Sequence, residues 1–188
     1  MQILFITCFF APHNTIGAVR TTKHAEKLLE LGCDIDVITA DGIPFPKSLQ
    51  TSFPKNRTFP VKWRNPLQLL KPSQTNEVDE IIEEIGGGGI IKAAVKEQLK
   101  DIIRKIVPLP DKYLFWYFNA IRVADRLIKE NGKPDLIYAS SSPYTSLITA
   151  QAISKKYKIP WVAELRDLWA DNHYKPKGLL APKLKKRF

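Results

Sequence analysis

One feature restricts the fold of this chain more than any other: in two regions, short apolar runs alternate with helical patterns. In the first region, "QILFIT" (residues 2–7) precedes a polar loop, a helical pattern from Ala18 to Leu31, and the apolar run "DIDVIT". Continuous apolar runs of this length are typical of strands buried on both faces of a parallel sheet. A strand, a helix and a strand in succession form the unit from which parallel sheets are built.

The same alternation returns in the last third of the chain. We expect a helix from Tyr113 to Asn131, a strand at "PDLIYA", a helix within "SSSPYTSLITAQAISKKY", and a buried strand at "IPWVAEL". Ser142 is expected to cap the second helix, with Pro143 in its first turn. Right-handed crossovers between such strands predict an α/β fold, a Rossmann-like doubly wound parallel sheet with helices on both faces.

Between these regions, residues 41–112 are expected to form an irregular and helical insertion. Residues 41–75 are rich in proline, with one candidate strand near "FPVKW". Amphipathic helices are predicted at residues 77–85 and 91–106, separated by four glycines whose backbone entropy opposes one continuous helix. The 188 residues are therefore predicted to form one domain, 1–188, that carries this insertion.

Charge is distributed unevenly along the chain. Residues 151–188 contain ten Lys/Arg and three Asp/Glu, a net +7, whereas the first 150 residues contain 19 and 16, a net +3. Such a basic end suits anionic partners, namely phosphorylated substrates, acidic lipid or nucleic acid, although a solvated lysine-rich helix has the same composition. No apolar run approaches the roughly 18–20 residues that cross a bilayer, and the two cysteines are too few for a disulfide framework. We therefore expect a cytoplasmic protein, peripheral on the inner face of the cell membrane if the basic end meets lipid.

Two predicted loops at the carboxyl ends of the strands, where ligands of doubly wound sheets bind, carry candidate binding residues. In "FFAPHNTIGAVR", Gly17 permits close approach of a ligand to the backbone, and the helix start offers amides to an anion. A glycine that only makes the turn is the alternative. In "SSSPY", the hydroxyls of residues 140–142 are suited to phosphate or to a sugar, or to capping the helix alone.

The third such loop is "ELRDLWAD". Arg166 and Asp167 follow the predicted strand, and Trp169 offers a flat ring that stacks on sugars or packs on neighbouring residues. A charge pair that only holds the edge of the sheet together is the alternative. Three chemically unusual loops at one edge of one sheet indicate a ligand site there.

Two acidic patterns in the sequence are not expected to bind a metal. The "DID" of residues 34–36 matches a metal-binding D-x-D, but it opens a strand and therefore lies at the opposite edge of the sheet. Glu164, Asp167 and Asp171 supply hard oxygen ligands, but Glu164 is assigned to a strand and the three need not converge. His24, on the first helix, is expected to be a packing or surface histidine.

With these loops, the chain resembles the N-terminal half of a retaining glycosyltransferase of the two-Rossmann-domain (GT-B) architecture, in the large family four. The resemblance is carried by "ILFITCFFAPHNTIGAVRTTKHAEKLLELGCDIDVIT", "LPDKYLFWYFNAIRVADRLI" and "PDLIYASSSPYTSLITAQAISKKYKIPWVAELRDLW", about half of the chain. Its most specific part is "ASSSP" followed by "ELRDLW". The most similar subgroup makes bacterial capsule, O-antigen and exopolysaccharide (surface polysaccharide) repeat units.

The resemblance implies an acceptor-side domain whose partner, a C-terminal domain with paired glutamates, supplies most contacts to the nucleotide sugar. This chain alone is then expected to be inactive. The implied reaction transfers a sugar from a UDP- or GDP-sugar to a hydroxyl of a saccharide or lipid-linked acceptor, with retention and without a metal or other cofactor. The resemblance places Gly17 and Arg20 at the glycine loop, and Arg166 and Asp167 where relatives contact the transferred sugar, so we expect Arg166 and Asp167 to be catalytic. Together with the other two loops, the residues expected to contact substrate or donor phosphate are Gly17, Arg20, Ser140, Ser141, Ser142, Tyr144 and Trp169.

Two other functions remain open. A non-catalytic basic Rossmann-like module for nucleic acid or a protein partner would need a cationic face interleaved with exposed aromatic residues. Most aromatic residues here fall in predicted strands and helices, so a nucleic acid partner is not expected. A nucleotide-sugar epimerase of similar fold is the second alternative.

Overall fold

This computed structural model of the chain describes residues 1–63, 111 and 113–166, which belong to one compact unit. The helices predicted at residues 77–85 and 91–106 lie outside the described residues. So do Asp167 and Trp169.

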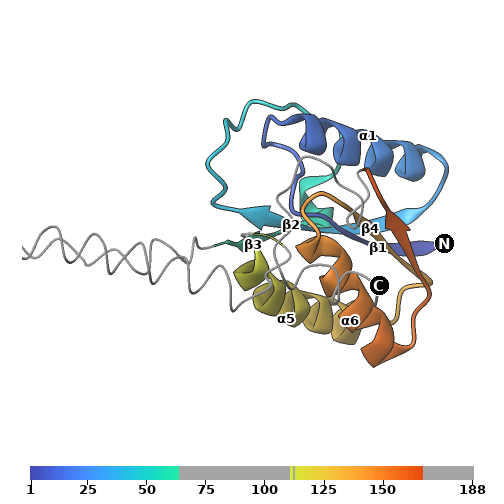
Figure 1. Cartoon of the computed structure of the whole chain (residues 1–188). Coiled ribbons are helices and arrows are strands. Elements are labelled where there is room, and N and C mark those ends of the chain that lie inside the picture. The colour runs from blue at the N-terminus through green and yellow to red at the C-terminus, as the bar shows by residue number, and fades with distance from the viewer. Residues whose placement is uncertain (64–110, 112, 167–188) are drawn as a thin grey trace, which may run out of the picture. The chain divides into compact units, whose positions relative to one another are not determined.

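A five-stranded parallel sheet forms the centre of the fold (Figure 1). Its order is β3-β2-β1-β4-β5, and every pair of neighbours is parallel. The strands are β1 (Gln2–Ile6), β2 (Asp34–Asp41), β3 (Thr58–Lys62), β4 (Leu136–Ser140) and β5 (Trp161–Glu164). The prediction of an α/β fold with a parallel sheet is therefore confirmed.

Three helices cover the sheet, with α1 (Ile16–Glu30) on one face and α5 (Leu114–Asn131) and α6 (Thr145–Tyr157) on the other (Figure 1). Right-handed crossovers explain this division, because the chain moves from β1 to β2 in one direction across the sheet and from β4 to β5 in the other. Helix α1 begins two residues earlier than predicted, where the Thr15 Oγ1 accepts the Ala18 amide at 3.1 Å. None of the helices in the described residues is long and apolar enough to span a membrane.

The core lies between the sheet and these helices. The central strands supply Phe5, Val37 and Ile137, and α5 contributes Trp116, all of them fully buried. Each such side chain stabilises the fold by about 1.5–3 kcal/mol relative to an exposed one. The short apolar runs of the sequence are thus the centre of the core.

The last strand differs from its prediction as a buried strand. Within the described residues, β5 pairs only with β4 and is an edge strand, so that Val162 and Ala163 are exposed. Ile159, just before the strand, is the buried residue of this run. An apolar run shows that a segment prefers a sheet, but it does not show how many neighbours the segment has.

The segment expected as an irregular insertion, residues 41–112, contains strand β3, at the position foreseen near "FPVKW". Pro60 cannot donate to a ladder and is tolerated because β3 is at the edge of the described sheet. Just after β3, the ring of Trp63 packs against that of Tyr113 with centroids 5.0 Å apart. Trp63 and Tyr113, on either side of residues 64–112 in the sequence, are therefore in contact.

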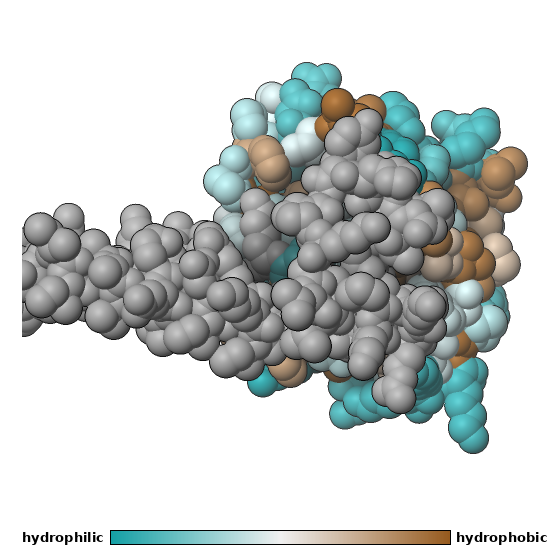
Figure 2. Space-filling model, viewed as in Figure 1, coloured by the Kyte–Doolittle hydropathy of each residue, from teal (hydrophilic) through white to brown (hydrophobic). Residues whose placement is uncertain are grey.

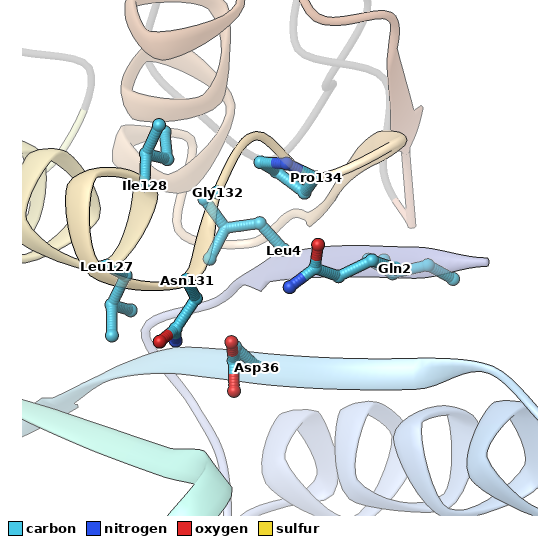
Figure 3. Close-up of a pocket in the computed structure, with 9 residues that line it drawn as sticks. Gln2, Leu4, Asp36, Leu127, Ile128, Asn131, Gly132 and Pro134 are labelled. Atoms are coloured by element: carbon cyan, nitrogen blue, oxygen red, sulfur yellow. The ribbon is translucent and has the colours of Figure 1, made fainter.

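The amino edge of the sheet contains a small cavity of about 10 Å³, room for one water molecule. In Figure 3, Asp36 of β2 points toward Asn131 at the end of α5, with Gln2 of β1 nearby. Burial raises the pKa of Asp36, although a hydrogen bond with Asn131 opposes the shift. A cavity of this size has no room for a substrate.

The "DID" aspartates at this edge are held by Arg57, which ends the short 3-10 helix η1 (Lys55–Arg57). Arg57 pairs with Asp34, and its Nε donates to the Ile35 carbonyl at 3.2 Å while lying 3.1 Å from Asp36 Oδ1. The pattern opens β2 at the amino edge, as predicted. Within the described ranges, no group of acidic, histidine or cysteine side chains is arranged to hold a metal ion.

Candidate functional site

Five polar side chains meet at the carboxyl edge of the sheet, beside β1 and β4. The strand order reverses direction between these two strands, and in open α/β sheets this is where ligands bind. We call the five residues the switch-point cluster; they are Arg20 and His24 of α1, Ser140 and Ser141 at the end of β4, and Glu164, the last residue of β5.

Arg20 is the centre of the switch-point cluster. Its Nη1 donates to Glu164 Oε1 at 2.6 Å, and its Nη2 donates to Ser140 Oγ at 3.1 Å and to the Ser141 carbonyl oxygen at 2.7 Å. The side chain is 25% exposed. Because it lies one turn after the start of α1, Arg20 joins that helix to the ends of two strands that come much later in the sequence.

Glu164 is the anionic partner in the switch-point cluster and is only 18% exposed. Its second carboxylate oxygen, Oε2, lies 3.6 Å from His24 Nδ1. Burial, together with the negative charge of Glu164, raises the pKa of Tyr138 on β4 to about 12. Glu164 therefore affects the electrostatics of β4 as well as those of α1.

Three buried polar atoms of the switch-point cluster have no hydrogen-bond partner within the described part of the chain. They are Arg20 Nε, Ser141 Oγ and Glu164 Oε2. Leaving such a group unsatisfied costs about 1–3 kcal/mol, so each one requires a partner, such as an ordered water or a ligand. Here a donor, a hydroxyl and a carboxylate oxygen lie within one small region, a combination that suits a ligand rich in hydroxyl groups or phosphate oxygens.

Exposed apolar side chains lie on the same two elements as Arg20 and Glu164. Ile16 and Val19 are exposed on α1, and Val162 and Leu165 are exposed in and just after β5. Figure 2 shows apolar surface over the beginning of α1. These side chains add apolar surface to the two elements that carry Arg20 and Glu164.

The N-terminus of α6 is occupied by a carboxylate of the chain itself. Asp111 accepts hydrogen bonds from the Thr145 amide at 2.9 Å, the Thr145 hydroxyl at 2.6 Å and the Tyr113 amide at 2.9 Å. The prediction that Ser142 caps this helix is wrong, because the helix begins at Thr145 and no side chain of the cap residue itself bonds the first turn. The favourable position for an anion at a helix start is therefore filled by Asp111.

The three serines of "SSSPY" do not act as one group. Ser140 and Ser141 are buried within the switch-point cluster, whereas Ser142 is exposed. Tyr144 is almost completely buried, in the core. Of this loop, the structure brings only Ser140 and Ser141 to Arg20.

Gly17 lies in the first turn of α1 and packs against Phe9. A Cβ at this position would lie 3.0 Å from Phe9 Cδ2, closer than ordinary van der Waals contact. The glycine therefore allows α1 to pack closely on the loop after β1. Arg166 is exposed, two residues after Glu164.

The sequence interpretation missed Glu164 as a member of the site, because it assigned this residue to a strand. Arg20 and Glu164 are separated by 144 positions in the sequence. The available signal was an acidic residue at the last position of an apolar strand, opposite a helix that carries an arginine and a histidine one turn apart.

We expect Asp111→Ala to destabilise the fold by about 1.5 kcal/mol, since it removes the cap of α6. Urea denaturation of the purified chain measures this change. Asp111→Asn keeps one carbonyl oxygen as an acceptor, so it should lose less stability than Asp111→Ala. Equal stability of Asp111→Ala and the parent chain would contradict the role of this carboxylate as a cap.

No protein-family model matches the chain, and a search of curated proteins returns no match.

Proposed function

We propose that this chain is the acceptor-side, doubly wound Rossmann-like domain of a retaining GT-B glycosyltransferase of surface-polysaccharide synthesis. The observation that carries the proposal is the switch-point cluster, where Arg20 meets Glu164 and Ser140. A cation, a carboxylate and hydroxyls at the carboxyl edge are the groups that bind saccharide hydroxyls and a diphosphate.

In this proposal Arg20 is held in position by Glu164 and supplies positive charge toward the departing diphosphate. Stabilising charge that develops in the transition state is the effect that usually dominates such transfers. Ser141 Oγ and Glu164 Oε2 accept hydrogen bonds from hydroxyl groups of the acceptor. Arg166 lies just beyond β5 on the same edge and contacts the transferred sugar together with Asp167. The reaction as proposed needs no metal.

The partners follow from the same proposal. The donor is a nucleotide-diphosphate sugar, held mainly by a second domain, and the acceptor is a saccharide or lipid-linked saccharide. The apolar residues Ile16, Val19 and Leu165 suit the lipid part of such an acceptor. A basic chain that takes a lipid-linked acceptor is placed at the inner surface of a membrane.

Binding of a lipid-linked acceptor tests the proposal. The probe is a disaccharide joined through diphosphate to a short prenyl chain, and isothermal titration calorimetry measures its affinity for the chain. We expect Arg166→Ala to weaken binding about tenfold, or about 1.4 kcal/mol, without a change in the free energy of unfolding, because Arg166 is exposed. Lys55→Ala, another exposed cation at the opposite edge of the sheet, is the control and should bind like the parent chain.

In an enzyme that also contains the donor domain, Arg166→Ala and Asp167→Asn should each lower turnover by about tenfold or more. Variants that melt early but keep full binding and turnover would show that these residues have a structural role. Failure of the chain to bind any saccharide diphosphate would exclude the proposed acceptor.

A further inference from the structure

Helix α5 carries a line of exposed residues that the site described above does not use. Successive members are three or four positions apart, so all five fall within an arc of about 80° on the helix surface. We call this line the α5 stripe; its members are Phe115, Phe118, Arg122, Arg126 and Lys129, and all are exposed. The opposite side of α5 is buried, through Trp116, Ala120, Ala124, Leu127 and Ile128.

The α5 stripe combines two large apolar rings with three positive charges. Phe115 and Phe118 are 46% and 56% exposed, which is uncommon for phenylalanine. They occupy the first turns of the helix, and the three cations follow along its length. No acidic residue of α5 lies between the cations on this line.

The two acidic residues of α5 flank the stripe. Asp125 is turned to α6, where it accepts hydrogen bonds from Lys156 Nζ at 2.6 Å and from the Tyr157 hydroxyl at 2.8 Å. Its charge is therefore balanced by Lys156. Glu130 lies on the other flank, and the cations and both acids line an open hollow of about 390 Å³. The surface is thus cationic along the line and can receive an anionic group.

We propose that the α5 stripe docks on an anionic lipid surface, with Phe115 and Phe118 among the acyl chains and the three cations at the phosphate headgroups. Exposed apolar rings beside basic residues on one side of a helix are the composition of interfacial helices. Each Lys or Arg close to an anionic surface improves binding about fivefold. An acidic protein would satisfy the cations, but it would leave the two rings in water unless it supplied an apolar pocket at the right place.

Docking by the α5 stripe would also orient the protein. Because β4 begins after α5 ends, the start of α5, with its two rings, lies toward the carboxyl edge of the sheet, where the switch-point cluster is located. Delivery of a lipid-linked acceptor to that edge rests on the proposed function. Docking itself does not, and its test needs no substrate.

Vesicle flotation of the full 188-residue chain tests this inference. The probes are vesicles of phosphatidylcholine alone and of phosphatidylcholine mixed with phosphatidylglycerol. We expect binding only to the mixed vesicles, weakening as salt is added. The variant Arg122→Gln/Arg126→Gln/Lys129→Gln should bind at least tenfold more weakly. Phe115→Ser/Phe118→Ser should also bind at least tenfold more weakly while keeping the salt dependence of the parent chain.

The matched control is Lys27→Gln/Lys55→Gln/Lys62→Gln, which removes the same charge from exposed positions off α5. It should bind like the parent chain, and circular dichroism checks that each variant is folded. An equal loss in the control would overturn the inference, because net charge alone would then explain binding. Binding to a single-stranded oligonucleotide or to polyglutamate through the stripe, with no binding to mixed vesicles, would also overturn it.

Discussion

Replacing Glu164 with alanine should lower the free energy of unfolding by about 3 kcal/mol. The carboxylate accepts the 2.6 Å hydrogen bond from Arg20 Nη1, and both side chains are mostly buried. Without it, the Arg20 guanidinium keeps its charge between α1 and the strand ends but loses its anionic partner. Removing one member of a buried pair costs more than the pair itself contributes, because the remaining charge is left uncompensated.

The double variant Glu164→Ala/Arg20→Met should therefore be more stable than Glu164→Ala alone. Urea denaturation of the four proteins of this cycle measures the coupling between the two residues. Glu30→Ala is the matched control, since Glu30 pairs with Lys27 on the exposed side of α1, and we expect a change of less than about 0.5 kcal/mol. If Glu164→Ala costs no more than Glu30→Ala, the pair at the end of β5 is an ordinary surface ion pair.

Acid should remove about 2 kcal/mol of stability through one residue, Glu26 of α1. Its Oε1 accepts hydrogen bonds from the Thr51 hydroxyl at 2.8 Å, the Ser52 amide at 2.8 Å and the Ser52 hydroxyl at 2.9 Å. The Lys23 ammonium lies 2.8 Å from Oε2. The hydrogen bond from Lys23, assisted by those from the loop and opposed by burial, lowers the pKa of Glu26 from 4.5 to about 2.

The folded chain holds Glu26 ionised more strongly than the unfolded chain does. The contribution of Glu26 to the free energy of unfolding is therefore complete above pH 4.5 and disappears as the pH falls toward 2. We expect the stability lost in acid to be smaller than the full pKa shift of Glu26 would give. The reason is that Lys23 is 69% exposed, so its charge is screened by water and salt. Urea midpoints between pH 2 and 7, for the parent chain and for Glu26→Gln, measure the effect.

The two curves should differ most near pH 7 and converge in acid, because protonated Glu26 and glutamine are both uncharged. Parallel curves over the whole range would show that Glu26 does not titrate with folding. The loop from Thr51 to Ser52 would then be held to α1 by other contacts.

The parts of the fold that could be predicted from the sequence depend on local patterns. Strand β1 lies within its predicted apolar run, and β2 and β4 extend two residues and one residue beyond theirs. The runs mark these strands because burial on both faces of a sheet selects continuous apolar sequence. Helix α5 ends at Asn131, as predicted, just before Gly132, whose φ of 88° suits glycine.

The parts that could not be predicted depend on contacts between distant residues. Nothing near Arg20 in the sequence indicates that Glu164 is its partner, and nothing near Thr145 indicates that Asp111, 34 positions earlier, caps its helix. The capping rule favoured Ser142 because it considers only neighbours along the chain. The edge position of β5 could not be predicted either, since it depends on which segment lies beside the strand.

The packing of Trp63 on Tyr113 has a consequence for how this fold can vary. With ring centroids 5.0 Å apart, these two residues hold together the described positions between which residues 64–110 lie in the sequence. The entropic cost of closing a loop rises only slowly with its length. Insertions, deletions or replacements in the sequence between Trp63 and Tyr113 should therefore be tolerated in evolution or in design, while the sheet and the Arg20–Glu164 pair stay in place.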